Sequence, residues 1–173
     1  VRTLERTFAK VMRKVAVKIT EGYTGKISVK PTGLEAYLGP KKYKPESQGH
    51  KDEVGVVNGL AWTSVGGEML KVEAVKMPGT GKLELTGSLG DVMKESARTA
   101  YSYIRSISEA LPLDMDFYKN TDIHIHFPEG AVPKDGPSAG IAITTAVVSA
   151  LTGIPVRADI AMTGEVTLTG NVL

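Results

Sequence analysis

Hydrophobic residues near the N-terminus recur at intervals of three and four, which is the spacing of one face of an α-helix. These residues are Val1, Leu4, Phe8, Val11 and Val15. Most basic residues fall on other positions, and Gly22 marks the end of the pattern. We predict a packed helix with a solvated basic face, followed by a short strand at residues 26–29 and a short helix at residues 31–38.

Residues 39–52 are polar and contain two prolines and two glycines, a composition typical of a linker. We therefore place a domain boundary here. Residues 1–40 form a helical segment, residues 41–52 a linker, and residues 53–173 a second domain.

The pattern changes to β-rich runs from residue 54 onward. Runs at 54–65, 68–77 and 82–87 are separated by Gly-Gly at 66–67 and by Pro-Gly-Thr-Gly at 78–81. A helix is expected at 91–111, a strictly alternating strand at 122–127, a nearly apolar helix at 138–151 and one or two short strands within 160–168. The expected face of the 91–111 helix consists of Val92, Ala97, Tyr101, Ile104 and Ile107. This order predicts an α+β fold with a mixed β-sheet and packed helices.

The composition excludes several classes of protein. Hydrophobic residues make up 42% and charged residues 23% of the 173 residues, as in a soluble globular domain rather than a disordered chain. The absence of cysteine excludes disulfides, thiolate zinc sites and a cysteine nucleophile. A net charge of +2 gives no support for nucleic-acid binding. No apolar run approaches the roughly 20 residues of a membrane span. We expect a cytoplasmic domain without membrane contact that, lacking an initial Met, is cut from a longer protein.

The segment Pro78-Gly79-Thr80-Gly81-Lys82 superficially resembles a phosphate-binding loop. That loop needs a Gly five residues before Gly81 and a Ser or Thr after the lysine, but Lys76 and Leu83 stand there. We interpret the segment as a hairpin turn.

His124 and His126 lie two residues apart on a predicted strand, so their side chains point to the same face. Two imidazoles could bind a metal, but a catalytic zinc needs a third protein ligand, and no residue is marked as one. We interpret them as partly buried histidines that line a sheet face, and we expect no metal site.

The segment PKDGPSAG, residues 133–140, places Ser138 between two glycines at the opening of a predicted helix. Small neighbours leave the hydroxyl accessible, and a helix N-terminus offers free N–H groups to an oxyanion. The pattern indicates either a nucleophile or a serine that only caps the helix.

A nucleophilic serine needs a base. Gly136-x-Ser138-x-Gly140 matches the nucleophile elbow of α/β-hydrolases, but no histidine follows Ser138 in this chain. His124, His126 and a buried, neutral lysine are the alternatives.

PKDGPSAG, preceded by DIHIHFPEGAV and followed by MTGEVTLTG and NVL, resembles the proteolytic domain of Lon, the ATP-dependent protease. The segments GLAWTSVGGE and LTGSLGDVMKESARTAYSYIRS carry the same resemblance. The opening VRTLER resembles the last helix of the ATPase lid that precedes this domain.

The resemblance implies roles for individual residues. Ser138 is the nucleophile, and its base is a lysine in a GG-x-K-E-K segment expected after Leu173. The domain at 53–173 is then incomplete, and a chain ending at Leu173 is inactive. Thr163 of the MTGE motif is expected to support that lysine. Arg2 is expected to sense nucleotide in the intact enzyme, and His124 and His126 are structural.

The resemblance also implies an ATP-dependent serine endopeptidase with a Ser-Lys dyad and an acyl-enzyme, which degrades unfolded polypeptides. ATP and magnesium belong to the ATPase domain, so no cofactor is expected in this chain, and the intact enzyme assembles as a hexamer. Substrate is expected to bind extended against the GLAWTS strand, at Trp62 and Thr63. Two alternatives stay open: a non-catalytic interaction module, and an α/β-hydrolase whose histidine lies beyond the chain end.

Overall fold

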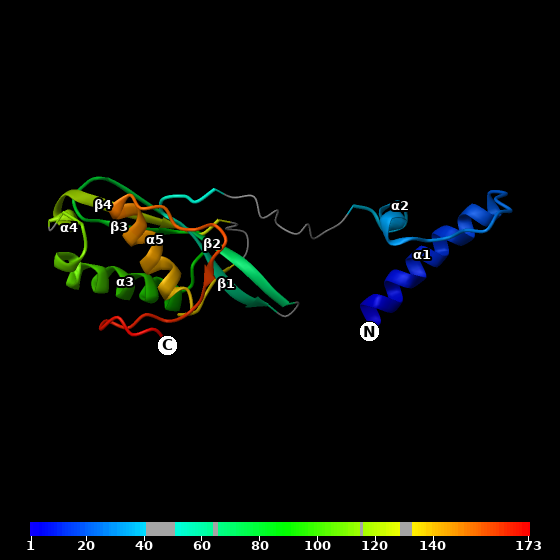
Figure 1. Cartoon of the computed structure of the whole chain (residues 1–173). Helices are drawn as coiled ribbons and strands as arrows, with labels where there is room; N and C mark the ends of the chain where they lie inside the picture. The colour runs from blue at the N-terminus through cyan, green and yellow to red at the C-terminus, as the bar shows by residue number, and fades with distance from the viewer. Residues whose placement is uncertain (41–50, 64–65, 115, 129–132) are drawn as a thin grey trace. The chain divides into compact units, whose positions relative to one another are not determined.

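A computed structural model describes residues 1–40, 51–63, 66–114, 116–128 and 133–173. The chain forms two compact units, Val1–Ser47 and Gln48–Leu173, and each is described by itself (Figure 1). Most of the predicted linker at 41–52 lies outside the described residues.

The first unit is helical. It contains α1 (Arg2–Thr20), the 3₁₀-helix η1 (Pro31–Gly33) and α2 (Leu34–Leu38), so the predicted helix at 31–38 is confirmed. Its buried hydrophobic side chains are Val11 of α1 and Tyr37 of α2. The Nζ groups of Lys10 and Lys14 donate to carbonyl groups of α2, each at 3.4 Å. The long basic side chains of α1 therefore help to hold α2 against it.

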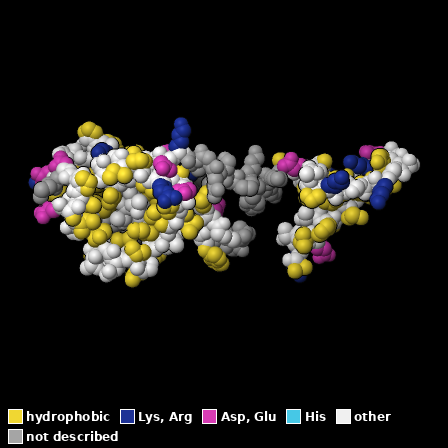
Figure 2. Space-filling model, in the orientation of Figure 1, with side chains coloured by type: hydrophobic (Ala, Val, Ile, Leu, Met, Phe, Trp, Pro, Cys, Tyr) yellow, Lys and Arg dark blue, Asp and Glu magenta, His cyan; other side chains and the backbone are white. Residues whose placement is uncertain are grey.

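Two expectations for this unit are wrong. Leu4 and Phe8 are 62% and 64% exposed, because α2 is a short helix that covers only a small part of the apolar face of α1. Figure 2 shows hydrophobic side chains at the surface of this unit. Residues 26–29 do not form a strand. A β-strand needs a partner for its backbone hydrogen bonds, and the described residues of this unit supply none.

The second unit is built on a five-stranded mixed sheet with the order β3-β4-β2-β1-β5. The strands are β1 (Val56–Thr63), β2 (Gly66–Pro78), β3 (Leu83–Thr86), β4 (Thr121–His126) and β5 (Ala161–Met162). The pairs β1/β2 and β2/β4 are antiparallel, whereas β3/β4 and β1/β5 are parallel. The predicted α+β fold with a mixed sheet is confirmed.

The helices α3 (Asp91–Ser106) and α5 (Gly140–Thr152) belong to the same core as one face of the sheet (Figure 1). Alternate residues of the strands point into this core, with Ile123 and Ile125 of β4 and Val72 of β2 fully buried. α5 is apolar on nearly all sides and buried, as predicted. Gly153 ends it in the left-handed conformation at φ 75°. The short elements η2 (Ser108–Ala110) and α4 (Phe117–Asn120) lie between α3 and β4.

The predicted hairpin at Pro78–Lys82 is wrong, because β4 lies between β2 and β3. The segment instead crosses the start of β4, where Asp122 accepts hydrogen bonds from the N–H groups of Thr80 and Lys82 at 2.8 and 2.7 Å. These bonds to a side chain replace those of a hairpin, so the connection depends on a residue 40 positions away from Lys82.

Smaller corrections concern the ends and faces of elements. Gly66 and Gly67 are the first residues of β2 and do not separate the strands, since Gly66 pairs with Thr63. α3 ends at Ser106. Ala97, Tyr101 and Ile104 of its predicted face are buried, but Val92 is 45% exposed and Met93 is buried instead. None of the helices in the described ranges combines the length and apolar character that crossing a membrane requires.

Candidate active site

Ser138 lies in the turn immediately before α5, and Ala139 is the N-cap residue of that helix. Among the residues that the structure describes, no side chain caps α5, and the interpretation of Ser138 as a simple capping residue is wrong. Ser138 is exposed, whereas Ala139 and Gly140 behind it are buried. Among the described residues, the hydroxyl of Ser138 forms no hydrogen bond. The helix is thus buried while its preceding serine faces solvent.

The loop that carries Ser138 is fastened to the start of α3. Gly90 N–H donates to the Lys134 carbonyl at 2.8 Å, and Lys134 N–H donates to the Ser88 carbonyl at 3.1 Å. Nearer the serine, the Ser96 hydroxyl donates to the Pro137 carbonyl at 3.2 Å. The loop is therefore held on both sides of residues 135–136.

Thr163 and Gly164 lie next to Ser138. Gly164 N–H donates to the Ser138 carbonyl at 2.7 Å, and the Thr163 hydroxyl makes a longer contact with the same oxygen at 3.4 Å. Ile141 N–H in turn donates to the Gly164 carbonyl at 3.0 Å. The structure therefore brings together two of the predicted site residues, Ser138 and Thr163, through the backbone of the segment after β5.

Two backbone N–H groups at the start of α5 are available to an oxyanion. Gly140 N–H donates to the Pro137 carbonyl and Ile141 N–H to Gly164. Within the described parts of the chain, the N–H groups of Ser138 and Ala139 donate to no protein acceptor. Both stand at the positive end of the helix dipole. This arrangement is suited to stabilising negative charge on a carbonyl oxygen beside Ser138.

His124 and His126 lie on the opposite face of the sheet. They alternate with the buried Ile123 and Ile125, which point toward the helices. His124 Nε2 and His126 Nδ1 both hydrogen-bond to the Thr86 hydroxyl, at 2.8 and 2.7 Å. The described residues contain no group of three or more ligating side chains that could hold a metal. The two histidines line a sheet face, and the sheet separates them from α5 and Ser138.

Trp62 and Thr63 stand at the end of β1 on a partly open edge. β1 pairs with β2 along its whole length, but with β5 only at Asn58 and Gly59. The described strands leave the other edge of residues 60–63 unpaired, and Trp62 is 86% exposed. Thr63 pairs with Gly66 through its backbone, and its side chain lies outside the described residues.

The parallel register relates this edge to Ser138. Met162 is level with Gly59, so the next residue, Thr163, leaves β5 where the unpaired edge of β1 begins. Thr163 also contacts the Ser138 carbonyl. An extended chain added to β1 at residues 60–63 would therefore run toward the serine.

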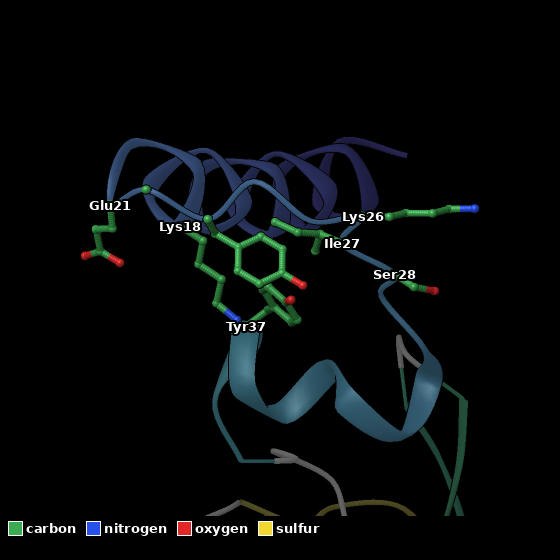
Figure 3. Close-up of a pocket in the computed structure, with 8 residues that line it drawn as sticks. Lys18, Glu21, Lys26, Ile27, Ser28 and Tyr37 are labelled. Carbon is green, nitrogen blue, oxygen red and sulfur yellow. The ribbon is translucent and has the colours of Figure 1, made fainter.

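Arg2 is the first residue of α1 and is exposed, in the unit that does not contain Ser138. That unit has a hollow of about 750 Å³ between the end of α1 and α2 (Figure 3). Lys18 reaches across it, with Nζ 4.9 Å from the centre of the Tyr37 ring. None of the predicted site residues lines this hollow.

The sequence reasoning missed Asp135. Its carboxylate accepts hydrogen bonds from Met93 N–H at 3.0 Å and from Gly136 N–H at 2.9 Å. The sequence gives one indirect indication of this role: the N-cap residue of α3 is Gly90, which has no side chain to cap the helix. A helix start without its own cap needs an acceptor from elsewhere in the chain.

Residues 10–173 match the family described as Lon protease (S16) C-terminal proteolytic domain. The whole chain is 60% identical to a Lon protease of Finegoldia magna and 56% identical to one of Aquifex aeolicus, covering 22% of each. It is 55% identical to a Lon protease of Fusobacterium nucleatum, covering 23% of that protein. The chain thus spans about a fifth of the length of these curated relatives.

Proposed function

Because this chain belongs to the family of Lon C-terminal proteolytic domains, we propose that it carries the peptide-cleaving site of a serine endopeptidase with Ser138 as nucleophile. The observation that carries the proposal is the position of Ser138, exposed at the start of a buried helix. It lies beside two N–H groups that donate to no acceptor in the described part of the chain. The resemblance of the PKDGPSAG segment to the Lon proteolytic domain also supports this residue.

The proposed reaction is amide hydrolysis through an acyl-enzyme. The Ser138 oxygen attacks the substrate carbonyl carbon and gives its proton to a base, while the N–H groups of Ser138 and Ala139 bind the resulting oxyanion. Collapse of this intermediate breaks the C–N bond and returns the proton to the departing amine. Water then attacks the ester carbonyl, and hydrolysis of the ester releases the new carboxylate and restores the serine.

We propose a lysine after Leu173 as the base, in the GG-x-K-E-K segment that the resemblance implies. His124 and His126 are poor candidates, since both hydrogen-bond to Thr86 on the far face of the sheet. Thr163, which is exposed beside Ser138, is in a position to support such a lysine. A polypeptide that stops at Leu173 should therefore leave an unstructured peptide intact, and one extended through the lysine should cleave it.

We propose that substrates are unfolded polypeptides that bind as an added strand along residues 60–63 of β1. Backbone hydrogen bonds supply affinity for any extended sequence, and the exposed Trp62 contacts substrate side chains. In the intact protein we propose an ATP- and magnesium-dependent cytoplasmic enzyme that assembles as a hexamer and senses nucleotide through Arg2. The support for these last features is the resemblance of the opening segment to the end of an ATPase lid.

The test uses the full-length protein. Ser138→Ala should abolish cleavage of an unstructured peptide and labelling by a fluorophosphonate, while the far-UV circular dichroism spectrum is unchanged. Ser102→Ala, which removes an exposed hydroxyl on α3, is the matched control and should keep full activity. Residual turnover of Ser138→Ala above about a thousandth of wild type would contradict the assignment. Absence of labelling in the wild type would favour a non-catalytic interaction module. The antiparallel central strand pairs already differ from the parallel sheet of an α/β-hydrolase.

A further inference from the structure

The start of α3 is capped by a residue that comes from the nucleophile loop. The first N–H groups of a helix lack partners within the helix, and an N-cap side chain normally accepts from the third one. In α3 that third residue is Met93, and its N–H donates to Asp135 Oδ1 at 3.0 Å across 42 positions of sequence. Asp135 thus performs for α3 the function that Gly90, its N-cap residue, lacks the side chain to perform.

Asp135 also organises its own loop. The same Oδ1 atom accepts from Gly136 N–H at 2.9 Å, and Gly136 adopts φ 125°. Ser138 follows Asp135 by three positions along the chain. The bond to Met93 therefore ties the path of residues 135–138 to a helix whose inner face, including Met93, is buried in the core.

The absence of a side chain at Gly90 leaves room for this carboxylate. A Cβ atom at Gly90 would lie 2.2 Å from Asp135 Cγ and 2.4 Å from Oδ2, well inside contact distance. The backbone of Gly90 has φ −71° and ψ 173°, which any residue adopts without strain. The close approach of Asp135 is therefore the feature of this site that a Cβ would disturb.

We infer that Asp135 is a positioning residue for the proposed peptidase reaction: its carboxylate, seated on the N-terminus of α3 over Gly90, fixes the loop that aims Ser138. This inference rests on the proposed function. The negative charge of the carboxylate is favourable at the positive end of the helix dipole. The two hydrogen bonds to the carboxylate restrain the position of the loop relative to α3. Without this anchor the serine remains in the protein, but its hydroxyl is no longer held at the attack position.

The experiment measures peptide cleavage by full-length variants under steady-state conditions, with thermal unfolding as a check on folding. A misplacement of about 1 Å in a reacting group can cost about a hundredfold in rate. We therefore expect Asp135→Ala to lower kcat by about a hundredfold with KM within about twofold. Asp135→Asn keeps an acceptor oxygen for Met93 N–H and should recover at least a tenth of the wild-type kcat.

Gly90→Ala gives an independent test, because it displaces the carboxylate without removing it. It should lower kcat as Asp135→Ala does, but it should add nothing in the Asp135→Ala background, where the atoms it would overlap are gone. Asp91→Ala is the matched control: Asp91 begins the same helix, yet its carboxylate is fully exposed and pairs, within the described ranges, with Lys94 alone at 3.4 Å. It should leave kcat unchanged.

The outcomes separate the two proposals. A folded Asp135→Ala variant with kcat within threefold of wild type would overturn the positioning role, as would additive effects of Gly90→Ala and Asp135→Ala. An equal loss of kcat in Asp91→Ala would also overturn it, because general weakening of α3 would then suffice. If Asp135→Ala does not fold, Gly90→Ala decides: a folded Gly90→Ala variant with kcat within threefold of wild type would overturn the positioning role. If Ser138→Ala remains active, the proposed function itself fails.

Discussion

Gly140 lies where α5 meets the segment after β5, and its replacement by alanine tests how the serine is supported. A Cβ atom there would lie 2.7 Å from Val166 N and 3.2 Å from Ser96 Oγ. Alanine is the better helix former, by at most about 1 kcal/mol. Overpacking a close-packed site costs about 1–3 kcal/mol, and loss of the hydrogen bond from Ile141 to Gly164 costs about 1 kcal/mol. The contact outweighs the helix propensity, so we expect Gly140→Ala to destabilise the domain by about 1–3 kcal/mol.

The assay is urea unfolding of the 173-residue chain, followed by far-UV circular dichroism. Tryptophan emission is a poor probe here, because Trp62 is already 86% exposed in the folded state. Hydrogen exchange should accelerate at the amide of Ile141, whose acceptor is displaced, and peptide cleavage by the full-length variant should fall as the Thr163 segment moves away from Ser138.

Gly67→Ala is the matched control, since a Cβ atom there meets nothing within 4 Å. It should leave the unfolding free energy within about 0.5 kcal/mol of wild type. Equal or greater stability of Gly140→Ala, together with unchanged exchange at Ile141, would refute the close packing of α5 against Val166.

Three further results are expected. Trp62 is the only tryptophan of this chain, so binding of an unstructured peptide along β1 should shift its emission to shorter wavelength in Ser138→Ala; an unshifted spectrum at saturating peptide would contradict strand addition. The N–H groups of Lys82 and Thr80 lower the pKa of Asp122, so its stabilisation is complete above about pH 4 and is lost as the pH falls through the folded-state pKa. Between pH 5 and pH 2 the unfolding free energy of Asp122→Asn, measured in urea, should therefore fall less than that of wild type. An equal fall in the two proteins would refute this. Burial raises the pKa of Tyr101, and its buried hydroxyl has no hydrogen-bond partner among the described residues, so Tyr101→Phe should match wild type or gain up to about 1 kcal/mol in urea unfolding; a clear loss would reveal a partner.

The sequence predicted those features that depend on local periodicity. Strict alternation in residues 122–127 predicted a strand with His124 and His126 on one face, because side chains of a strand alternate whatever its partners are. The structure buries Ile123 and Ile125 on the opposite face. The motif around Ser138 likewise marked a helix start with small neighbours. These predictions needed no knowledge of distant parts of the chain.

The features it missed depend on pairing between distant segments. Nothing in the residues Pro78–Lys82 reveals that β4 will insert between the strands on either side of them. The cap of α3 by Asp135 is of the same kind, since capping rules consider residues next to the helix. The exposure of Leu4 and Phe8 also follows from what packs on α1 and not from their spacing.

The carbonyl of Ser138 is held by Gly164, which lies later in the chain, and β5 pairs with β1 from far earlier. A ribosome adds residues from the N-terminus, and domains fold as their segments emerge. While residues 161–166 are still inside the exit tunnel, neither the hydrogen bond from Gly164 to the Ser138 carbonyl nor the pairing of β5 with β1 can form. A nascent chain therefore carries Ser138 for some time before it carries the segment that holds the Ser138 carbonyl.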